Sequence, residues 1–341
     1  MSIASLLDAP RIKIVAQLVP LAGTRFQPTG FPDLGAATYP SPTEPGITLL
    51  LVESVQSMAN RMEAQLWPVG NLTAASVVEG LPYLRVVSDT GEYLTSSRTE
   101  SHRLASAYVK DATFDGTSGL ALILAELGLA PNQPIDHEKV HRAIFSLDPL
   151  CLLHGVFFAD KNWPGQPKVA RVISAFIEAE GAQEAYSGGV KFDHVSNSGD
   201  KDAGKGSKEG FGNVPYPRTE YVARSITAFF VIDTSQIRRY PLDRRQQELL
   251  LALGLYEIRS LLDEGLRLRT ACDLEVVGEP CVERPEGAAL PSLMELEGWI
   301  HERIGEVKPP REGVYKTTKT TKASGKDEVT DAEASEGPEE Q

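Results

Sequence analysis

The sequence predicts an α+β fold in which helices cover one face of an antiparallel sheet. Strand-like segments alternate along the chain with helices that have one apolar face. The hydrophobic content of 41% and the charged content of 24% are those of a globular protein with its own core. We expect one domain over residues 1–310, which includes an excursion at 187–218, and a disordered tail over 311–341.

The first half of the chain predicts a strand, a long loop and a helix. Residues 11–20 read as a strand, and Gly23–Gly46 is rich in proline and glycine, which indicates a loop. Apolar residues then recur at helical spacing from about Leu51, although residues 47–52 also fit a buried strand. A hairpin is expected around Asp89-Thr90-Gly91.

The remaining elements follow from the same signals. Thr95–Val109 predicts a short helix capped by Ser96, Ser97 or Thr99. The other expected helices are 120–129, 136–145, 243–264 and 293–304, and the other expected strands are 150–159, 169–183, 219–233 and 266–277. Residues 169–183 also fit a helix, but the strand is favoured.

Charge restricts where a nucleic acid could bind. The formal net charge is −13, and removing residues 312–341 still leaves −9. A nucleic-acid site on this chain must therefore be a local basic groove on an acidic protein.

The cysteines, the N-terminus and the apolar runs predict the cellular compartment of the protein. Three cysteines without CxxC spacing indicate reduced thiols, and neither a disulfide frame nor a zinc site. The N-terminus lacks the features of a signal peptide, and no apolar run approaches the roughly 20 residues that span a bilayer. We expect a cytoplasmic protein with no membrane partner, no metal and no cofactor.

The loop and the helix that follows it carry a cation, neutral hydrogen-bonding groups and a ring, without an obvious nucleophile–base pair. This mixture suits a phosphate backbone with exposed bases better than it suits bond-breaking. The candidate contact residues here are Thr24, Arg25, Gln27, Thr29, Phe31, Ser54, Gln56, Ser57, Asn60 and Arg61. As a structural alternative, Arg25 and Arg61 could hold the loop to the helix, and Gln56, Ser57 and Asn60 could cap the helix or pair with the loop.

Three further groups are candidates for RNA contact. Each also has a structural alternative: a helix start with a solvated face, a solubilising lysine-rich loop, or a salt bridge at a sheet edge. The groups are Ser96, Ser97, Arg98, His102 and Arg103; Lys191, Phe211 and Arg218; and Arg267 and Arg269.

Several segments together resemble the RAMP-type backbone subunit of the type I-G (formerly I-U) CRISPR Cascade. The resemblance extends over about residues 10–305. The motifs are GTRFQPTGFPDLGAA (23–37), LLVESVQSMANRME (50–63), TSSRTESHRL (95–104), SGGVKFDHV (187–195), GFGNVPYPRTEY (210–221) and GLRLRTACDLE (265–275).

This resemblance implies a modified RNA-recognition (ferredoxin-like) fold, with a palm, finger-like insertions and a thumb-like excursion at 187–218. It implies a subunit without catalytic residues, whose copies oligomerise along one CRISPR RNA so that the guide pairs with target DNA. The implied partners are CRISPR RNA, target DNA through the guide, further copies of the chain and other Cascade subunits.

Two enzymatic alternatives remain open. A guide-RNA-processing ribonuclease could use His102 or His194 as a general acid or base. The segment HEKVH, with His137, Glu138 and His141, matches the letters of the zinc-protease motif, but it lies on a short predicted helix without an evident third ligand. A scaffold that assembles through protein contacts alone is a further alternative.

Overall fold

The computed structural model describes residues 2–31, 35–68, 72–191, 214–304 and 311–316. Its largest sheet is antiparallel, with strand order β16-β17-β1-β15-β12-β5-β4, and β18 also pairs with β1. The strands are β1 (Ile12–Pro20), β4 (Thr38–Pro40), β5 (Thr48–Glu53), β12 (Ile173–Glu180), β15 (Ser225–Ile232), β16 (Leu266–Arg269), β17 (Cys272–Val276) and β18 (Cys281–Arg284).

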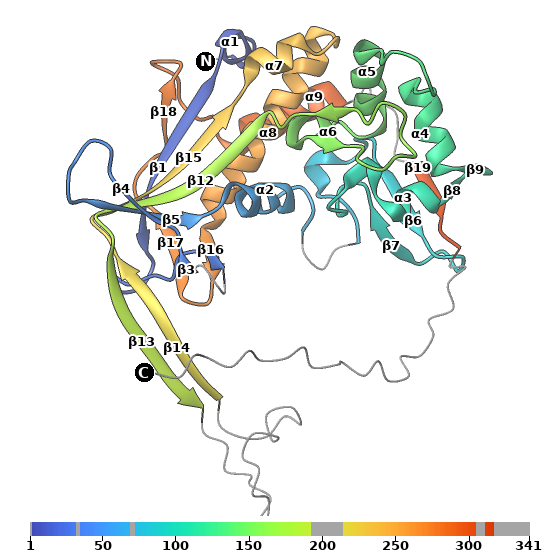
Figure 1. Cartoon of the computed structure of the whole chain (residues 1–341). Coiled ribbons are helices and arrows are strands. Elements are labelled where there is room, and N and C mark those ends of the chain that lie inside the picture. Colours follow the sequence, from blue (N-terminus) through green and yellow to red (C-terminus); the bar gives the residue numbers. More distant parts are fainter. Residues whose placement is uncertain (1, 32–34, 69–71, 192–213, 305–310, 317–341) are drawn as a thin grey trace, which may run out of the picture.

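Helices cover one face of this sheet (Figure 1). They are α1 (Ile3–Asp8), α2 (Val55–Ala64), α7 (Thr234–Arg239), α8 (Arg244–Glu264) and α9 (Leu293–Ile304). Side chains along β12 and β15 alternate between buried and half-buried, as expected for strands with helices on one side only. The order β1-α2-β12-β15-α8-β17 is therefore a β-α-β-β-α-β arrangement whose central strands lie in the order β17-β1-β15-β12.

A second region is inserted between α2 and β12. Its five-stranded sheet has the order β7-β6-β19-β8-β9, and β19 runs parallel to β6. The strands are β6 (Leu84–Val87), β7 (Tyr93–Ser96), β8 (Thr113–Phe114), β9 (Thr117–Ser118) and β19 (Arg311–Val314). The helices and short strands of this insertion are η1 (Ser76–Val78), η2 (Arg103–Ala105), α3 (Ala107–Asp111), α4 (Gly119–Leu127), α5 (His137–Leu147), α6 (Leu150–His154), β10 (Val156–Phe157) and β11 (Lys168–Val169).

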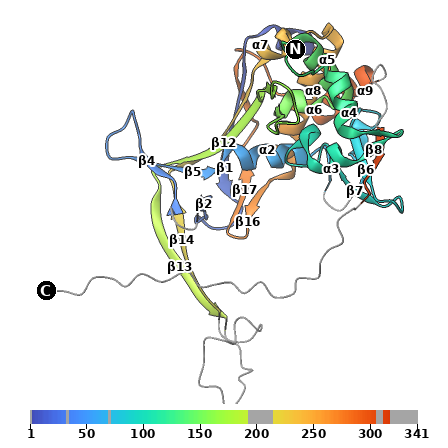
Figure 2. The ribbon, with the colours of Figure 1, turned by 45° about the vertical axis from the view of Figure 1, so that its right-hand side comes forward.

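A two-stranded hairpin, β13 (Gln183–Lys191) with β14 (Val214–Val222), extends away from the main sheet, as both ribbon views show (Figures 1 and 2). The loop after β1 is held against the base of this hairpin. Phe26 is buried and exchanges backbone hydrogen bonds with Tyr221 of β14. Within its described residues, the loop between β1 and β5 forms the short pair β2 (Gly30–Phe31) and β3 (Gly35–Ala36) and the edge strand β4.

Most of the predicted elements are confirmed. The α+β class is correct, and β1, the β6–β7 hairpin, α4, α5, β12, α8 and α9 lie where the sequence places them. The strand expected at 219–233 is divided between the end of β14 and β15. Helix α8 begins with a capping box, in which Asp243 accepts from the backbone of Gln246 while the Gln246 side chain accepts from the backbone of Asp243.

Several boundaries were wrong. Residues 150–159 were expected to be a strand, but they form α6 and the short β10, because an apolar run buried on all sides has no periodicity to separate helix from strand. The helix expected from Leu51 begins at Val55, since β5 occupies 48–53. Residues 266–277 fold into two paired strands, β16 and β17.

The capping prediction for Thr95–Val109 was also wrong. Ser106, not Ser96, Ser97 or Thr99, caps the short helix α3 by accepting from the backbone of Tyr108. The three earlier residues belong to β7 and the turn that follows it.

The domain boundary predicted at residue 310 is too early. Residues 311–314 form β19 between β6 and β8, so the five-stranded sheet includes part of the expected tail. Residues 317–341, and residues 192–213 of the excursion with its predicted contact residue Phe211, lie outside the described residues.

Candidate nucleic-acid interface

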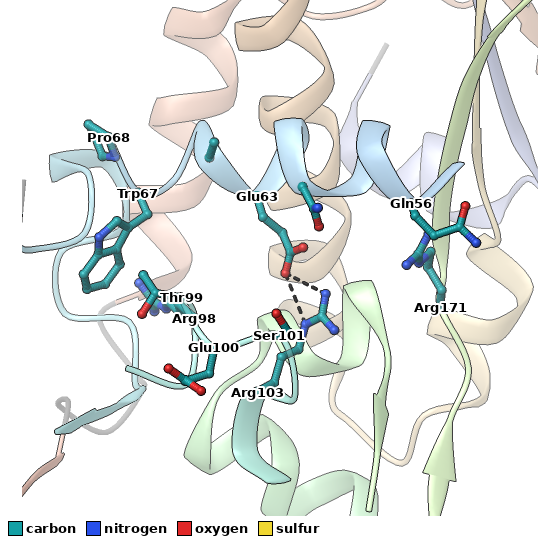
Figure 3. A pocket seen from close by; sticks show the side chains of 12 residues that line it. Gln56, Glu63, Trp67, Pro68, Arg98, Thr99, Glu100, Ser101, Arg103 and Arg171 are labelled. Carbon is teal, nitrogen blue, oxygen red and sulfur yellow. Dashed lines mark hydrogen bonds and ion pairs between the residues drawn. The ribbon is translucent and has the colours of Figure 1, made fainter. Parts of the chain in front are cut away.

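A cleft of about 500 Å³ lies between helix α2 and the turn at residues 99–103 (Figure 3). Besides the carboxylates Glu63 and Glu100, its lining includes arginines, amides and an indole. The arginines are Arg98, Arg103 and Arg171, the amides are Gln56 and Asn60, and the indole is Trp67. The cleft is elongated, with Trp67 and Pro68 at one end and Gln56 and Arg171 at the other (Figure 3).

Helix α2 presents its polar face to this cleft because its apolar face is used in the core. Met58, Ala59 and Met62 are buried, whereas Gln56 and Asn60 are exposed. The helix begins at a defined residue, since Ser54 is its N-cap and accepts from the backbone of Ser57 (3.2 Å). The helical period thus places the two amides one turn apart on the cleft side.

Arg103 faces α2 across the cleft. Its Nε and Nη2 donate to Glu63 Oε1 at 3.1 and 2.8 Å. Burial alone would lower the pKa of Arg103, but the charge of Glu63 outweighs it and the pKa is raised. The backbone of Arg103 has φ of +50°, a conformation uncommon for a residue with a side chain. Strain of this kind is often found at functional sites.

Arg171 closes the other end of the cleft. Its Nη1 donates to the carbonyl of Val55 in the first turn of α2 (3.3 Å). Burial and then the nearby charge of Arg103 lower the pKa of Arg171. Arg103 and Arg171 both line the cleft, so an anion placed between them would be attracted to both.

Arg98 lies beneath the cleft and is almost fully buried. Its guanidinium lies over the ring of Tyr83, 4.5 Å from the ring centroid, and Nη2 donates to the carbonyls of Leu81 and Pro82. Its Nε is 3.8 Å from Asp148 Oδ1, too long for a hydrogen bond. Within the described residues, Nε and Nη1 have no hydrogen-bond acceptor.

The balance of charge in the cleft is positive. Its lining holds three arginines and two carboxylates, Glu63 and Glu100, while a third carboxylate, Asp148, lies beside Arg98 beneath the cleft. Glu100 accepts from the hydroxyls of Thr95 and Ser106, so its negative charge is partly compensated by these donors. The cleft is thus a local basic site on a protein of net charge −13.

The structure brings together residues that the sequence placed in two separate groups. Gln56 and Asn60 of the helix group and Arg98 and Arg103 of the second group line the same cleft. Sequence reasoning missed Arg171 and Trp67. Neither had a local signal, because each reaches the cleft only through the packing of β12 and α2 against the inserted region.

Arg25 and Arg61 do not meet in this cleft. Arg25 lines a different hollow of about 310 Å³, together with Glu220 and Asp273, and its Nη1 lies 3.4 Å from Glu220 Oε2. Arg61 is directed at the protein itself, where it donates to the carbonyl of Leu268 (2.6 Å) and to Glu53 (3.2 Å). Within the described residues, the two candidate arginines therefore do not share one hollow.

Arg61 and Arg269 share one structural partner, the buried carboxylate of Glu53. Its side chain is 1% exposed and receives Arg61 at 3.2 Å and Arg269 at 2.6 Å. Arg269 also donates to the carbonyl of Gln27 at 2.7 Å, which fixes the loop after β1. Arg267, two residues earlier, is exposed, and a bulge in the β16–β17 pairing lies between these two arginines.

Four of the predicted polar residues are used within the fold. Ser54 and Ser57 form the start of α2. Ser97 donates to Asp148 (2.6 Å) and accepts from the backbone of Leu84, and the backbone N–H of Ser96 donates to Thr99. These contacts favour the structural alternative for the serines of both groups.

Other predicted residues lie around a shallow hollow of about 690 Å³ at the base of the hairpin. Gln27, Thr29 and Arg269 line it, together with Glu184 of β13. Thr24 is exposed beside Arg25 in the neighbouring hollow. The side chains of Phe31, Lys191 and Arg218 lie outside the described residues, although their backbones belong to β2, β13 and β14.

The histidine alternatives have little support within the described residues. His102 is exposed, and no described side chain orients its ring by a hydrogen bond or an ion pair; His194 lies outside those residues. His137 and His141 share a face of α5, with ring centroids 6.4 Å apart, but Glu138 pairs with Arg142. A search of the described residues found no group of three side chains arranged to hold a metal.

The fold and the cleft together define an α+β protein with a basic, amide-lined cleft. Residues 12–184, about half of the chain, match the family described as CRISPR-associated protein GSU0053 (Cas_GSU0053). The chain belongs to this family, which confirms the resemblance to type I-G (formerly I-U) CRISPR proteins found in its motifs.

Two solved structures are similar at a low level. A chain of the structure titled "CRISPR RNA-guided surveillance complex, pre-nicking" is 12% identical, with a TM-score of 0.38, and the alignment covers 82% of this chain and 73% of that one. The crystal structure of Thermofilum pendens Csc2 is 10% identical, with a TM-score of 0.31 and coverage of 89% and 80%. Neither likeness bears on function at these scores. The search of curated proteins found no match.

No helix within the described residues is long and apolar enough to cross a bilayer.

Proposed function

We propose that this chain is a non-catalytic RNA-binding subunit of a type I-G CRISPR complex. Several copies assemble along one guide RNA, together with other Cascade subunits, and hold the guide so that it pairs with target DNA. The main sheet and its helices act as a ferredoxin-like palm, the inserted region as fingers, and the β13–β14 hairpin as the base of the thumb.

The observation that carries this proposal is the basic cleft beside α2. Guanidinium groups bind phosphate through two parallel hydrogen bonds, and amide groups bind ribose and phosphate oxygens without any change of protonation. Arg103 and Arg171 supply the first kind of contact, and Gln56 and Asn60 supply the second. Membership of a CRISPR-associated family supports RNA as the ligand.

The β-α-β-β-α-β order of the main sheet supports the palm assignment, because ferredoxin-like folds share this order. The hairpin supports the thumb assignment, since β13 and β14 extend the chain away from the sheet (Figure 1).

Binding of a guide RNA to the full chain, measured by fluorescence anisotropy over a range of salt concentrations, tests the proposal. We expect affinity to fall as salt rises, through counterion release. The variant Arg103→Ala with Arg171→Ala should bind several-fold more weakly and show a shallower salt dependence. The matched control is Arg142→Ala, since Arg142 is an exposed arginine on α5 that does not line the cleft.

Each alternative function has its own outcome in this experiment. Equal RNA affinity of the double variant and the control would remove the cleft from the site. Specific cleavage of a repeat-containing RNA, lost in His102→Ala or His194→Ala, would establish the ribonuclease. Metal in the purified protein, lost in His137→Ala, would establish a metal-dependent hydrolase. Assembly that resists nuclease would indicate a protein-only scaffold.

A further inference from the structure

We infer that the cleft holds one whole nucleotide of the RNA, with its base stacked on Trp67 and its phosphate between Arg103 and Arg171. This inference rests on the proposed function and adds a base-binding subsite to it. It follows from the way the two ends of the cleft differ in chemistry (Figure 3).

The end formed by Trp67 and Pro68 is apolar and aromatic. Tyr93 stacks on one face of the indole, with ring centroids 5.9 Å apart and an interplanar angle of 27°, and Tyr83 meets it edge-on at 5.6 Å. The two tyrosines hold the indole in place, and the rest of the ring lines the cleft. A fixed aromatic ring at the wall of a hollow is a stacking platform for a planar base.

The part of the cleft from Arg103, near its middle, to Arg171 at the far end is cationic (Figure 3). Both arginines line the same cleft, and the charge of Arg103, after burial, lowers the pKa of Arg171. Glu63 already neutralises part of Arg103, whereas the contact recorded for Arg171 is a neutral carbonyl. A single phosphate at this end would interact with both cations.

Arg98 is the second observation that points to a ligand. It is almost fully buried beside Thr99, at the end of the cleft that holds Trp67 (Figure 3), and its Nε and Nη1 have no hydrogen-bond acceptor within the described residues. A buried guanidinium costs free energy when its donors are unsatisfied, and its charge favours negative groups nearby even without direct contact. Asp148 already opposes the charge of Arg98, so it is the unsatisfied donors of Arg98 that favour a ligand with acceptor atoms at this end of the cleft.

The base-binding end has few free groups that could read a base edge. The Thr99 hydroxyl is engaged with the backbone N–H of Ser96 and with Tyr93. Glu100 is engaged with Thr95 and Ser106. With these groups occupied, the contact is stacking without hydrogen-bonded readout, and stacking accepts any base. The subsite thus accepts a nucleotide with any of the four bases.

The test compares a short oligouridine with a sugar-phosphate oligomer of the same length that has no bases. The wild-type chain should bind the oligouridine about tenfold more tightly. Trp67→Ala should erase this difference, and Trp67→Phe should retain most of it. Oligoadenosine and oligocytidine should show the same loss in Trp67→Ala. Indole fluorescence of the wild type should be quenched by oligouridine and not by the oligomer without bases.

The outcomes separate this inference from the proposed function. Equal binding of the two oligomers by the wild type, with a normal effect of Arg103→Ala, would overturn the base subsite and leave RNA binding intact. So would a base-dependent gain that persists in Trp67→Ala. Failure of both oligomers to bind would overturn the proposed function as well. If Trp67→Ala does not fold, the wild-type comparison, its fluorescence and Trp67→Phe still decide the question.

Discussion

Glu53 is a buried carboxylate with two arginine partners. Arg61 lies 8 residues from it in the sequence, and Arg269 lies 216 residues from it. Glu53 joins the end of β5, helix α2 and the strand β16 at one point. A charge at this depth is tolerated only with such partners, because desolvation of an unpaired carboxylate is costly. Arg61 and Arg269 therefore stabilise the fold by pairing with Glu53, and this contribution can be measured.

Arg269→Ala should destabilise the protein by about 1–3 kcal/mol, because Glu53 and the carbonyl of Gln27 each lose a charged donor. Arg267→Ala is the control from the same strand, and its exposed side chain predicts a change of less than about 0.5 kcal/mol. Urea unfolding measures both. Equal stability of the two variants would show that the Glu53 contacts contribute nothing.

A second buried ion pair predicts how stability depends on pH. His154 Nε2 lies 2.8 Å from Glu257 Oε2, and both side chains are fully buried. Burial alone would lower the pKa of His154, but the charge of Glu257 outweighs it, and the pKa is raised above 6.5. The stability that this proton contributes is therefore fully present below pH 6.5 and is lost as the pH rises through the folded-state pKa.

Glu257→Gln should reverse this dependence. Without the carboxylate, burial lowers the pKa of His154, so the variant should lose stability as the pH falls below 6.5. The free energy of unfolding of both proteins, measured on each side of this pH, gives slopes of opposite sign if the assignment is correct. His301→Gln is the control, since His301 is exposed on α9. Parallel slopes would contradict the prediction.

The residue types at the site could be predicted from the sequence, but which side chains point into the cleft could not. Gln56 and Asn60 follow from the helical period of α2, because the apolar residues of that helix define the opposite face. Asn60 and Arg61 are neighbours in sequence, yet Asn60 lines the cleft and Arg61 donates to the backbone carbonyl of Leu268. Only the long-range packing of β16 against α2 decides between these roles.

At the scale of elements, helices with complete end signals were the easiest to predict. Helix α8 has Asp243 at its start and Gly265 at its end, and both positions were correct. Helix α6 has neither a capping side chain nor an exposed face to create a period, and it was predicted as a strand. Strand β19 was missed because its four residues lie in a polar stretch, and their partner β6 is far away in sequence.

Two truncations test the role of β19. A chain that ends at residue 316 keeps β19 and should unfold at the same temperature as the full chain. A chain that ends at residue 310 loses the strand between β6 and β8 and exposes Phe114, against which Gly313 packs closely. Its melting temperature should fall by several degrees, since the sheet loses its central strand. Identical melting curves for the two would show that β19 does not stabilise the sheet.

At the scale of the whole molecule, net charge and local charge have opposite signs. The chain carries −13, yet the cleft beside α2 has more cations than carboxylates. Composition alone argued against nucleic acid, and it could not locate the cleft because Arg98, Arg103 and Arg171 come from two distant segments. The α+β class depends on the order of elements along the chain, and for that reason it was predictable.

The acidic end of the chain should weaken RNA binding through long-range repulsion. Residues 317–341 contain seven carboxylates and three lysines, so the chain that ends at residue 316 is less negative by four charges. This shorter chain should bind guide RNA more tightly at low salt, and the difference should vanish when the Debye length becomes short. Anisotropy titrations at low and high salt measure it. A difference that persists at high salt would indicate direct contact.

The parallel pairing of β19 with β6 also affects the order in which the protein matures on the ribosome. Residues 84–87 leave the exit tunnel long before residues 311–314 are synthesised. Until translation reaches the last tenth of the printed sequence, β6 and β8 lack the strand that joins them. The inserted region therefore cannot complete its five-stranded sheet until residues 311–314 have been synthesised, and chaperones would find unpaired strand edges there during synthesis.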